Sequence, residues 1–230
     1  MLRQAEQGDR LAGDRPVGAQ VYRMLRERII GMSLLPGERI SEAEIAKALA
    51  VSRQPVREAF IKLSEDGLVE VRPQRGTYVR RISESAVMDA RFVREAIEAD
   101  IARLVAETRE PALVAELRAQ LAAQARLGDG ETAAFMKLDE RFHQTLAEAA
   151  GKRFAWTVIR DVKVQMDRVR FLAVQRFPRR KLVEQHAAIV DGIDTGDPGR
   201  AETAMRAHLR EILSDLPTIA REHPDYFEAG

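Results

Sequence analysis

The chain has 230 residues, of which 45% are hydrophobic, 5% aromatic and 32% charged, and it contains no cysteine. This composition is typical of a helical globular protein and excludes a fibrous or intrinsically disordered chain. The missing cysteines exclude disulfide bonds, thiolate metal sites and cysteine nucleophiles, so a bound metal ion would need imidazole and carboxylate ligands.

The formal net charge of +1 hides an uneven distribution along the chain. Residues 1–81 contain 15 Lys and Arg against 11 Asp and Glu, whereas the remainder contains 22 against 25. This polarity favours a nucleic-acid-binding module joined to a neutral or acidic domain. Residues 1–15 are polar, and no later stretch approaches ~20 uninterrupted apolar residues. We therefore expect a disordered leader over residues 1–15 and a cytoplasmic protein with no membrane partner.

The first third of the chain has the signals of three helices. Apolar residues at helical spacing predict a first helix over residues 18–32. Ser41 followed by Glu44 has the form of a capping box and predicts a short second helix. Ser52 is expected to cap a third helix, with Pro55 in its first turn, where the missing N–H is tolerated.

Two strands are predicted next, over residues 68–71 and 77–80, on either side of the turn-rich segment 72–76. Helix, helix, turn, helix and hairpin is the order of a winged helix-turn-helix. The sequence therefore predicts this DNA-binding module over residues 16–82.

From residue 83 to about residue 220 the chain reads as amphipathic, alanine-rich helices. Gly, Pro and polar residues interrupt the pattern at five places and predict about six helices with short connections. Helices joined by short connections pack as antiparallel neighbours. We expect an all-helical bundle over residues 83–222, followed by a tail over residues 223–230, in a mainly α fold. The five breaks are at residues 110–111, 128–130, 151, 177–178 and 194–199.

The predicted third helix carries candidate base-reading residues in its first turns, as a helix in the major groove requires. Arg53 could bond a guanine, Gln54 could pair with an adenine, and Arg57 could hold a phosphate or a second guanine. The alternative is that the two arginines form a solvated face with Glu58. With the predicted wing, the candidate DNA-binding residues are Ser52, Arg53, Gln54, Arg57, Arg72, Arg75 and Gly76.

Four segments of this region closely resemble the GntR superfamily of bacterial regulators. The resemblance implies that the residues matching Arg53, Gln54 and Arg57, with Arg75 and Gly76 on the wing, contact double-stranded operator DNA. It also implies a homodimer on a palindromic operator, which agrees with the weak binding expected of one small reader alone. The segments are residues 36–42, 51–59, 66–69 and 75–79.

One aspartate and three histidines are candidate metal ligands in the helical half. Asp139 and His143 are four residues apart and therefore share one helix face. His186 and His208 each stand among apolar residues and are expected to point inward. Folding the chain back at residues 194–199 would place them level on antiparallel helices. The alternative for any single one of them is a neutral core histidine bonded to a carbonyl.

This spacing resembles the FCD ligand domain of the FadR subfamily, with a helix count closer to its VanR-type branch. The resemblance covers about residues 83–216 and implies that the four positions bind a divalent metal ion, often zinc or nickel. Arg94 lies on an apolar helix line, so it is either paired with Glu98 or another acid, or aimed into a cavity. The resemblance implies the second role, in which a small organic acid bridges the ion and Arg94.

These observations predict a DNA-binding transcriptional regulator, acting as a homodimer, that represses until a metal-bound small carboxylate acts as effector. One alternative is a metal-dependent hydrolase-like domain fused to a DNA-binding module, since an ion with open positions can activate water. The chain has no His-Glu-x-x-His pattern, and Glu184 is the one general base that could be suggested. A purely structural ion, or none, is the third reading.

Overall fold

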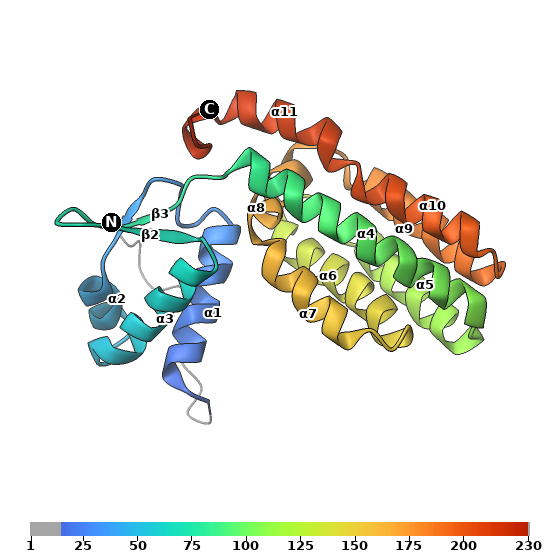
Figure 1. Cartoon of the computed structure of the whole chain (residues 1–230), viewed down its shortest axis with the longest axis horizontal. Coiled ribbons are helices and arrows are strands. Elements are labelled where there is room, and N and C mark those ends of the chain that lie inside the picture. The colour runs from blue at the N-terminus through green and yellow to red at the C-terminus, as the bar shows by residue number, and fades with distance from the viewer. Residues whose placement is uncertain (1–14, 230) are drawn as a thin grey trace. The chain divides into compact units, whose positions relative to one another are not determined.

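The computed structural model describes residues 15–229, drawn as a ribbon in Figure 1. All but one residue of the expected leader lies outside this range. The described chain divides into two compact units, an N-terminal unit of residues 15–83 and 223–229 and a helical unit of residues 84–222. The predicted fold class is confirmed, because the chain is mainly helical and carries a winged helix-turn-helix ahead of an all-helical part.

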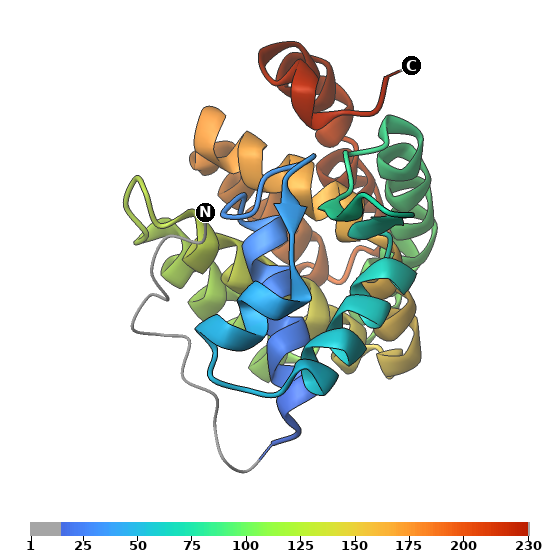
Figure 2. The ribbon, with the colours of Figure 1, turned by 90° about the vertical axis from the view of Figure 1, so that its left-hand side faces the viewer.

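The N-terminal unit has the predicted order of helices, with one additional strand. Its three strands form an antiparallel sheet in the order β1-β3-β2, and the two-residue β1 was not predicted. A strand this short lacks the alternation on which a sequence-based assignment depends. The helices can be followed in Figure 2. The elements are α1 (Val17–Ile30), β1 (Arg39–Ile40), α2 (Glu42–Ala48), α3 (Arg53–Glu65), β2 (Val69–Arg72) and β3 (Gly76–Val79).

Two serines stand at the helix starts where the sequence places them. The Ser41 hydroxyl accepts a 3.5 Å hydrogen bond from the Glu44 backbone N–H at the start of α2. Ser52 occupies the N-cap position of α3 in an extended conformation, but its side chain makes no capping hydrogen bond. The Ser52 side chain is exposed and therefore accessible to another partner.

The C-terminal segment packs within the N-terminal unit. The Ile82 N–H donates to the Tyr226 carbonyl at 2.8 Å, and the Glu228 N–H donates to the Ile82 carbonyl at 2.9 Å. Phe227 is only 5% exposed, and Arg80 Nε lies 3.0 Å from Glu228 Oε1. The residues set apart as a tail in the sequence analysis thus include a 3-10 helix, Pro224–Tyr226, and a buried aromatic ring.

The helical unit contains eight helices among its described residues, so the prediction of six is wrong. All five predicted breaks are present, but the chain also turns at Lys163 and between Leu209 and Ile212. Neither position has the Gly or Pro that marks a break in sequence. The likeness to the VanR-type branch therefore stays a prediction without the support of a six-helix count. The helices are α4 (Glu84–Thr108), α5 (Pro111–Ala125), α6 (Thr132–Ala149), α7 (Arg153–Val162), α8 (Val164–Arg176), α9 (Arg179–Asp194), α10 (Pro198–Leu209) and α11 (Ile212–Glu222).

Helix α10 packs against α4 and α9, and this packing places the site described below. A Cβ atom added to Gly192 would lie 2.6 Å from the Ala201 backbone nitrogen, so α9 and α10 approach closely there. The surrounding core is apolar and includes Leu117, Phe142 and Ile189, each 0% exposed. None of the helices in residues 15–229 is long and apolar enough to cross a membrane.

Candidate metal centre and nucleic-acid interface

The four candidate ligands converge on one buried point in the helical unit. Helix α6 supplies Asp139 and His143, α9 supplies His186, and α10 supplies His208. One ligand atom from each side chain lies within 4.8 Å of the others, and all four residues are buried. The return of the chain after α9 therefore brings His186 and His208 together, as the sequence analysis expects.

The imidazole nitrogens in this cluster are as close as ligands of one ion. The Nε2 atom of His208 lies 3.3 Å from Nε2 of His186 and 3.2 Å from Nε2 of His143. Nε2 of His186 is also 3.5 Å from Oδ1 of Asp139. Two nitrogens bound at about 2.1 Å to a common cation lie roughly 3.0 to 3.4 Å apart, depending on coordination geometry.

Two glutamines orient two of these rings. Nδ1 of His186 lies 2.9 Å from Oε1 of Gln124, whose amide nitrogen donates to the Leu138 carbonyl at 3.4 Å. Nδ1 of His208 lies 3.1 Å from Oε1 of Gln185. Since the Gln185 amide nitrogen must donate to the Glu211 carboxylate, at 2.7 Å, its oxygen is the atom that faces the ring. Both imidazoles therefore carry their proton on Nδ1.

An acidic residue orients the third ring. Nδ1 of His143 lies 2.5 Å from Oε2 of Glu98, and Oε1 of the same carboxylate accepts from Arg94 Nε at 2.6 Å. Burial opposes ionisation of Glu98, but Arg94 and His143 lower its pKa to about 2. The ionised carboxylate faces Nδ1 of His143 and accepts its N–H, which leaves Nε2 to face His208.

The chemistry of this donor set fits a divalent metal ion. Burial lowers the pKa of His186 to about 3 and places the pKa of His208 well below its ordinary value, so both rings are neutral. Burial alone would raise the pKa of Asp139, but the charge of the Arg170 guanidinium holds it well below its ordinary value. Lone pairs of neutral imidazoles that face one another beside a carboxylate repel unless a cation lies between them.

A cavity of about 20 Å³ adjoins this cluster. His208, Arg94 and Arg170 line it together with residues from α8 to α11. Arg94 is 1% exposed, and its Nη1 atom has no hydrogen-bond partner among the described residues. Arg94 is therefore both paired with Glu98 through Nε and part of the cavity lining, while its contact with an organic acid stays a prediction.

The other site residues lie at the start of α3. Arg53, Gln54 and Arg57 fall in its first five residues and are exposed. Glu58 accepts a 3.2 Å hydrogen bond from Gln54 Nε2 and pairs with neither arginine among the described residues. In the described part of the chain, Arg53 and Arg57 have no ion pair. Both guanidinium groups are free to meet a phosphate or a base edge.

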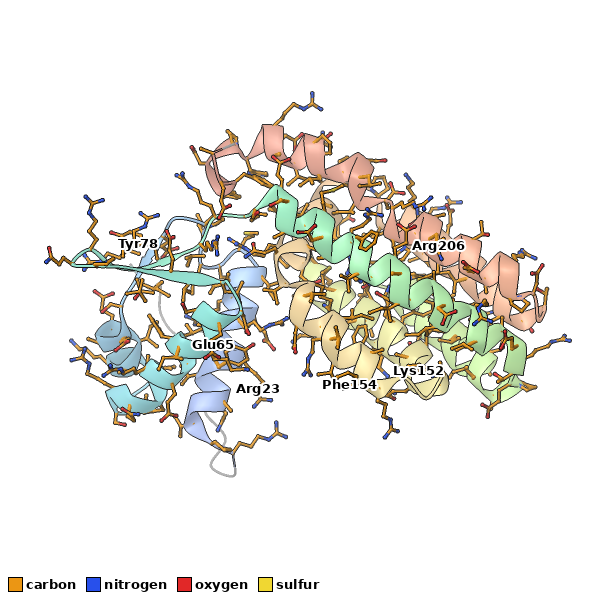
Figure 3. The ribbon with its side chains drawn as sticks, in the orientation of Figure 1. Arg23, Glu65, Tyr78, Lys152, Phe154 and Arg206 are labelled. Carbon is orange, nitrogen blue, oxygen red and sulfur yellow. The ribbon has the colours of Figure 1, made fainter. Side chains whose placement is uncertain are left out.

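The wing is formed by β2, β3 and the turn between them. Arg72 and Arg75 are exposed there, and the Arg72 guanidinium pairs with Glu70 and lies 4.4 Å from the Tyr78 ring centre. Tyr78 is labelled in Figure 3. Gly76 has a φ of +105°, and an added Cβ would lie 2.9 Å from Arg39 Nε. The backbone conformation and the closeness of Arg39 therefore both favour glycine at position 76, in addition to the proposed approach to DNA.

Two family models match the chain. The model described as bacterial regulatory proteins of the gntR family matches residues 18–79, and the model of the FCD domain matches residues 89–211. The chain is a gntR-family regulator with an FCD domain. As a member of this family it is a DNA-binding transcriptional regulator rather than an enzyme, which overturns the hydrolase-like alternative. Glu184, the general base considered for that alternative, is exposed and pairs with Arg180 at 2.7 Å.

Individual gntR-family relatives extend over nearly the whole chain. The HTH-type transcriptional repressor RspR of Escherichia coli K12 is 40% identical over 219 residues, covering 92% of this chain and 94% of the relative. A probable D-xylose utilization operon transcriptional repressor of Paenarthrobacter nicotinovorans is 30% identical over 198 residues, covering 86% of this chain and 87% of the relative.

Solved structures support the fold. Escherichia coli McbR/YncC has a TM-score of 0.73 at 18% identity, covering 90% of this chain and 98% of that chain. A GntR transcriptional regulator from Rhodococcus sp. RHA1 has a TM-score of 0.72 at 24% identity, covering 87% and 97%. At these identities the likeness concerns the arrangement of elements and not the ligand.

Four residues of the FCD site were missed or only half assigned from sequence. Arg170 Nη2 lies 2.7 Å from Asp139 Oδ1, and Gln124 and Gln185 orient two histidines. Glu98 was considered only as a partner of Arg94, although it also holds His143. A polar residue in an otherwise apolar helix stripe is the signal that could have found Arg170 and Gln124.

Proposed function

We propose that this protein is a homodimeric repressor that binds a divalent metal ion and a small carboxylate effector in its FCD domain. The observation that carries the proposal is the convergence of three imidazole Nε2 atoms and one carboxylate beside a cavity lined by Arg94. DNA recognition is assigned to residues 16–82, and effector binding and dimerisation to residues 83–222.

Asp139, His143, His186 and His208 would hold the ion, with zinc or nickel as the first candidates. These four ligands contain no thiolate, and an octahedral ion held by them would offer its two remaining positions to a carboxylate or to waters. The ring orientations support this role, because a ligating histidine ordinarily donates its second N–H to a carboxylate or carbonyl oxygen.

The charge balance of the site supports an anionic effector. Arg94 is matched by Glu98, and Arg170 is matched by Asp139, so a divalent ion would bring positive charge that no carboxylate of the cluster compensates. Arg94 Nη1, buried and without a hydrogen bond, is a suitable donor for the incoming carboxylate. A small organic acid that touches both the ion and Arg94 would satisfy both requirements.

Operator binding is assigned to α3 and the wing. Arg53 and Gln54 would contact bases, Arg57 a phosphate or a base, and Ser52, Arg72, Arg75 and Gly76 would complete the interface. A homodimer on a palindromic operator follows from two-fold symmetry, which couples two weak half-site contacts. The effector changes operator affinity only if it prefers the dimer geometry that fits DNA poorly.

Metal analysis and operator binding test the two halves of the proposal. Protein stripped with a chelator should bind one Ni²⁺ or Zn²⁺ per chain by calorimetry, and His208→Ala should remove that binding while keeping a cooperative unfolding transition. Binding that survives both His208→Ala and His143→Ala would overturn the assigned ligands. If the ion is lost without any change in the response to carboxylates, the ion is structural and the effector half of the proposal is wrong.

Arginine substitutions test the assignment of α3. Arg53→Ala and Arg57→Ala should each weaken binding to a genomic operator fragment by about tenfold or more. Arg126→Ala is the matched control, because Arg126 is an exposed arginine of the helical unit. Equal affinity and an unchanged salt dependence in the α3 variants would contradict the assignment.

A further inference from the structure

Two acidic residues line the cavity that adjoins the four candidate metal ligands. Glu211 lies between α10 and α11, and Asp215 lies on α11. They share this cavity with Arg94, Arg170 and His208. The lining therefore contains two arginines beside His208 and two carboxylates, one from the α10–α11 connection and one from α11.

The two acids differ in their partners. Glu211 accepts a 2.7 Å hydrogen bond from Gln185 Nε2 and pairs with Lys181 Nζ. The Asp215 carboxylate has no hydrogen bond or ion pair within residues 15–229. Burial, followed by the charge of Glu211, raises the pKa of Asp215 to about 6. Asp215 is thus a half-buried acceptor without a donor, in a cavity lined by Arg94, whose buried Nη1 atom has no acceptor.

The rest of the cavity lining is apolar. It includes Ala173, Val174, Leu182 and Ile212. A ligand here needs a carboxylate for the ion and Arg94, a short apolar middle, and a far end acceptable to two carboxylates. A second carboxylate would be repelled by Glu211 and Asp215, and a methyl group would leave Asp215 without a donor.

We propose that the effector is a short carboxylate whose far end carries a hydrogen-bond donor, an ammonium or a hydroxyl group, accepted by Asp215 and Glu211. This inference rests on the proposed function, because it assumes that the other end of the effector is the metal-bound carboxylate. It adds the class of ligand, and it gives α11 a direct contact with that ligand.

The size of the cavity restricts this class further. A volume of about 20 Å³ admits little more than one water molecule. An effector must therefore be short, and its entry must move side chains of the lining apart. Lys181 is 62% exposed at its side chain, and its pairing with Glu211 is one contact that can open at low cost.

A matched set of three-carbon acids tests the proposal on Ni²⁺-loaded full-length protein. Propionate, 3-hydroxypropionate, β-alanine and malonate differ mainly at the far end, which is methyl, hydroxyl, ammonium or carboxylate. We expect 3-hydroxypropionate or β-alanine to bind at least about tenfold more tightly than propionate, and malonate to bind more weakly than either, by calorimetry. The corresponding four-carbon acids repeat the comparison at greater length.

The variant Asp215→Asn links this preference to its residue. Asparagine keeps the shape of the side chain but removes the charge, so the preference for the donor-bearing acid over propionate should fall by about tenfold while propionate affinity stays unchanged. Asp129→Asn, at an exposed aspartate of the α5–α6 connection, is the control. If Asp215→Asn reduces the preference for β-alanine over propionate more than the preference for 3-hydroxypropionate over propionate, the donor is a cation.

Two results would overturn the inference. In one, propionate and malonate bind as tightly as the donor-bearing acids. In the other, Asp215→Asn retains the full preference. Failure of the proposed function looks different, since then no acid of either length binds the Ni²⁺-loaded protein and Arg94→Lys has no effect on any of them.

Discussion

The orientation of each imidazole in the cluster depends on a neighbour that does not itself face the ion. Gln124 and Gln185 accept the Nδ1 protons of His186 and His208, and Glu98 accepts that of His143. Phe142 stacks on His186 with the ring centres 4.4 Å apart. These contacts fix both the tautomer and the ring plane, so they determine how well the lone pairs are aimed at a common point.

Gln185→Met should therefore weaken metal binding without removing a ligand. Methionine has a similar length but accepts no strong hydrogen bond, so His208 loses the group that holds its proton on Nδ1. We expect Ni²⁺ affinity to fall about 10- to 100-fold in a competition assay with a chelating dye. Gln175→Met, at an exposed glutamine of α8, should leave it unchanged. An affinity within twofold of the unaltered protein would show that Gln185 does not position His208.

Asp215 gives a pH dependence whose sign follows from its environment. Its pKa is raised from 3.8 to about 6 in the folded protein, so the folded state binds this proton more tightly than the unfolded chain. The contribution of Asp215 to the free energy of unfolding consequently falls as the pH rises from about 4 to about 6. Above this window the folded protein carries an ionised, half-buried carboxylate at a cost in stability.

Asp215→Asn should remove that cost. We expect the free energy of unfolding of the effector-free protein, measured in urea at pH ~7.5, to rise by about 1 kcal/mol. The rise is smaller than the full pKa difference would give, because the Asp215 carboxylate is partly solvated. The gain should shrink as the pH approaches ~4, where Asp215 is protonated. Asp129→Asn provides the baseline at both values. A gain that is equal at both pH values would mean that it comes from packing and not from ionisation.

At the scale of elements, the crossing of α9 and α10 determines whether two of the histidines meet. His186 lies nearly two turns before Gly192 on α9, and His208 lies nearly two turns after Ala201 on α10. The helices touch where Gly192 faces Ala201, and a Cβ at Gly192 would lie 2.8 Å from the Ala201 Cα. The missing side chain therefore lets both helices present their histidines at the same level.

Gly192→Ala tests this crossing. The added methyl group meets backbone atoms of α10 that cannot rotate away, so the helices must separate, at a cost of about 1 to 3 kcal/mol in thermal or urea unfolding. We also expect weaker Ni²⁺ binding, because His186 and His208 move apart. Gly199→Ala, in the first turn of α10, is the matched control, since its Cβ would meet only Asp197 Oδ1 at 3.6 Å. Equal stability of the two variants would contradict the close crossing.

The sequence predicts these elements well where the chain carries local signals. Pro111, Gly151 and the segment 194–199 end or start helices by their backbone preferences alone, and the predicted breaks agree with the structure there. The additional turns at Lys163 and Arg210 have no such residue, so no local signal in the sequence predicts them. For Arg170 and Gln124 a polar residue in an apolar stripe was a local signal, but their partners Asp139 and His186 are distant in sequence and could not be assigned from it.

At the scale of the whole molecule, the chain passes between its two units twice. It leaves the N-terminal unit after Ser83 to form α4, and it returns after Glu222 at the end of α11. The returning segment lies along Ile82, with backbone hydrogen bonds in both directions. Helix α11, which carries Asp215 on the cavity lining, is therefore continuous with a segment of the DNA-binding unit.

Phe227→Ala measures how much the N-terminal unit depends on this returning segment. Phe227 is 5% exposed and packs in the same unit as Ile82, which is 0% exposed, so removing the ring leaves a cavity and uncovers apolar surface. We expect a loss of about 3 kcal/mol in the unfolding of that unit. Hydrogen exchange should locate this loss of stability. Exchange should become faster at the Ile82 and Glu228 amides, which donate to the Tyr226 and Ile82 carbonyls. Phe154→Ala is the matched control, because Phe154, labelled in Figure 3, is 81% exposed on α7. If the two phenylalanine variants lose equal stability, or if protection at Ile82 is unchanged, the C-terminal segment does not stabilise the DNA-binding unit.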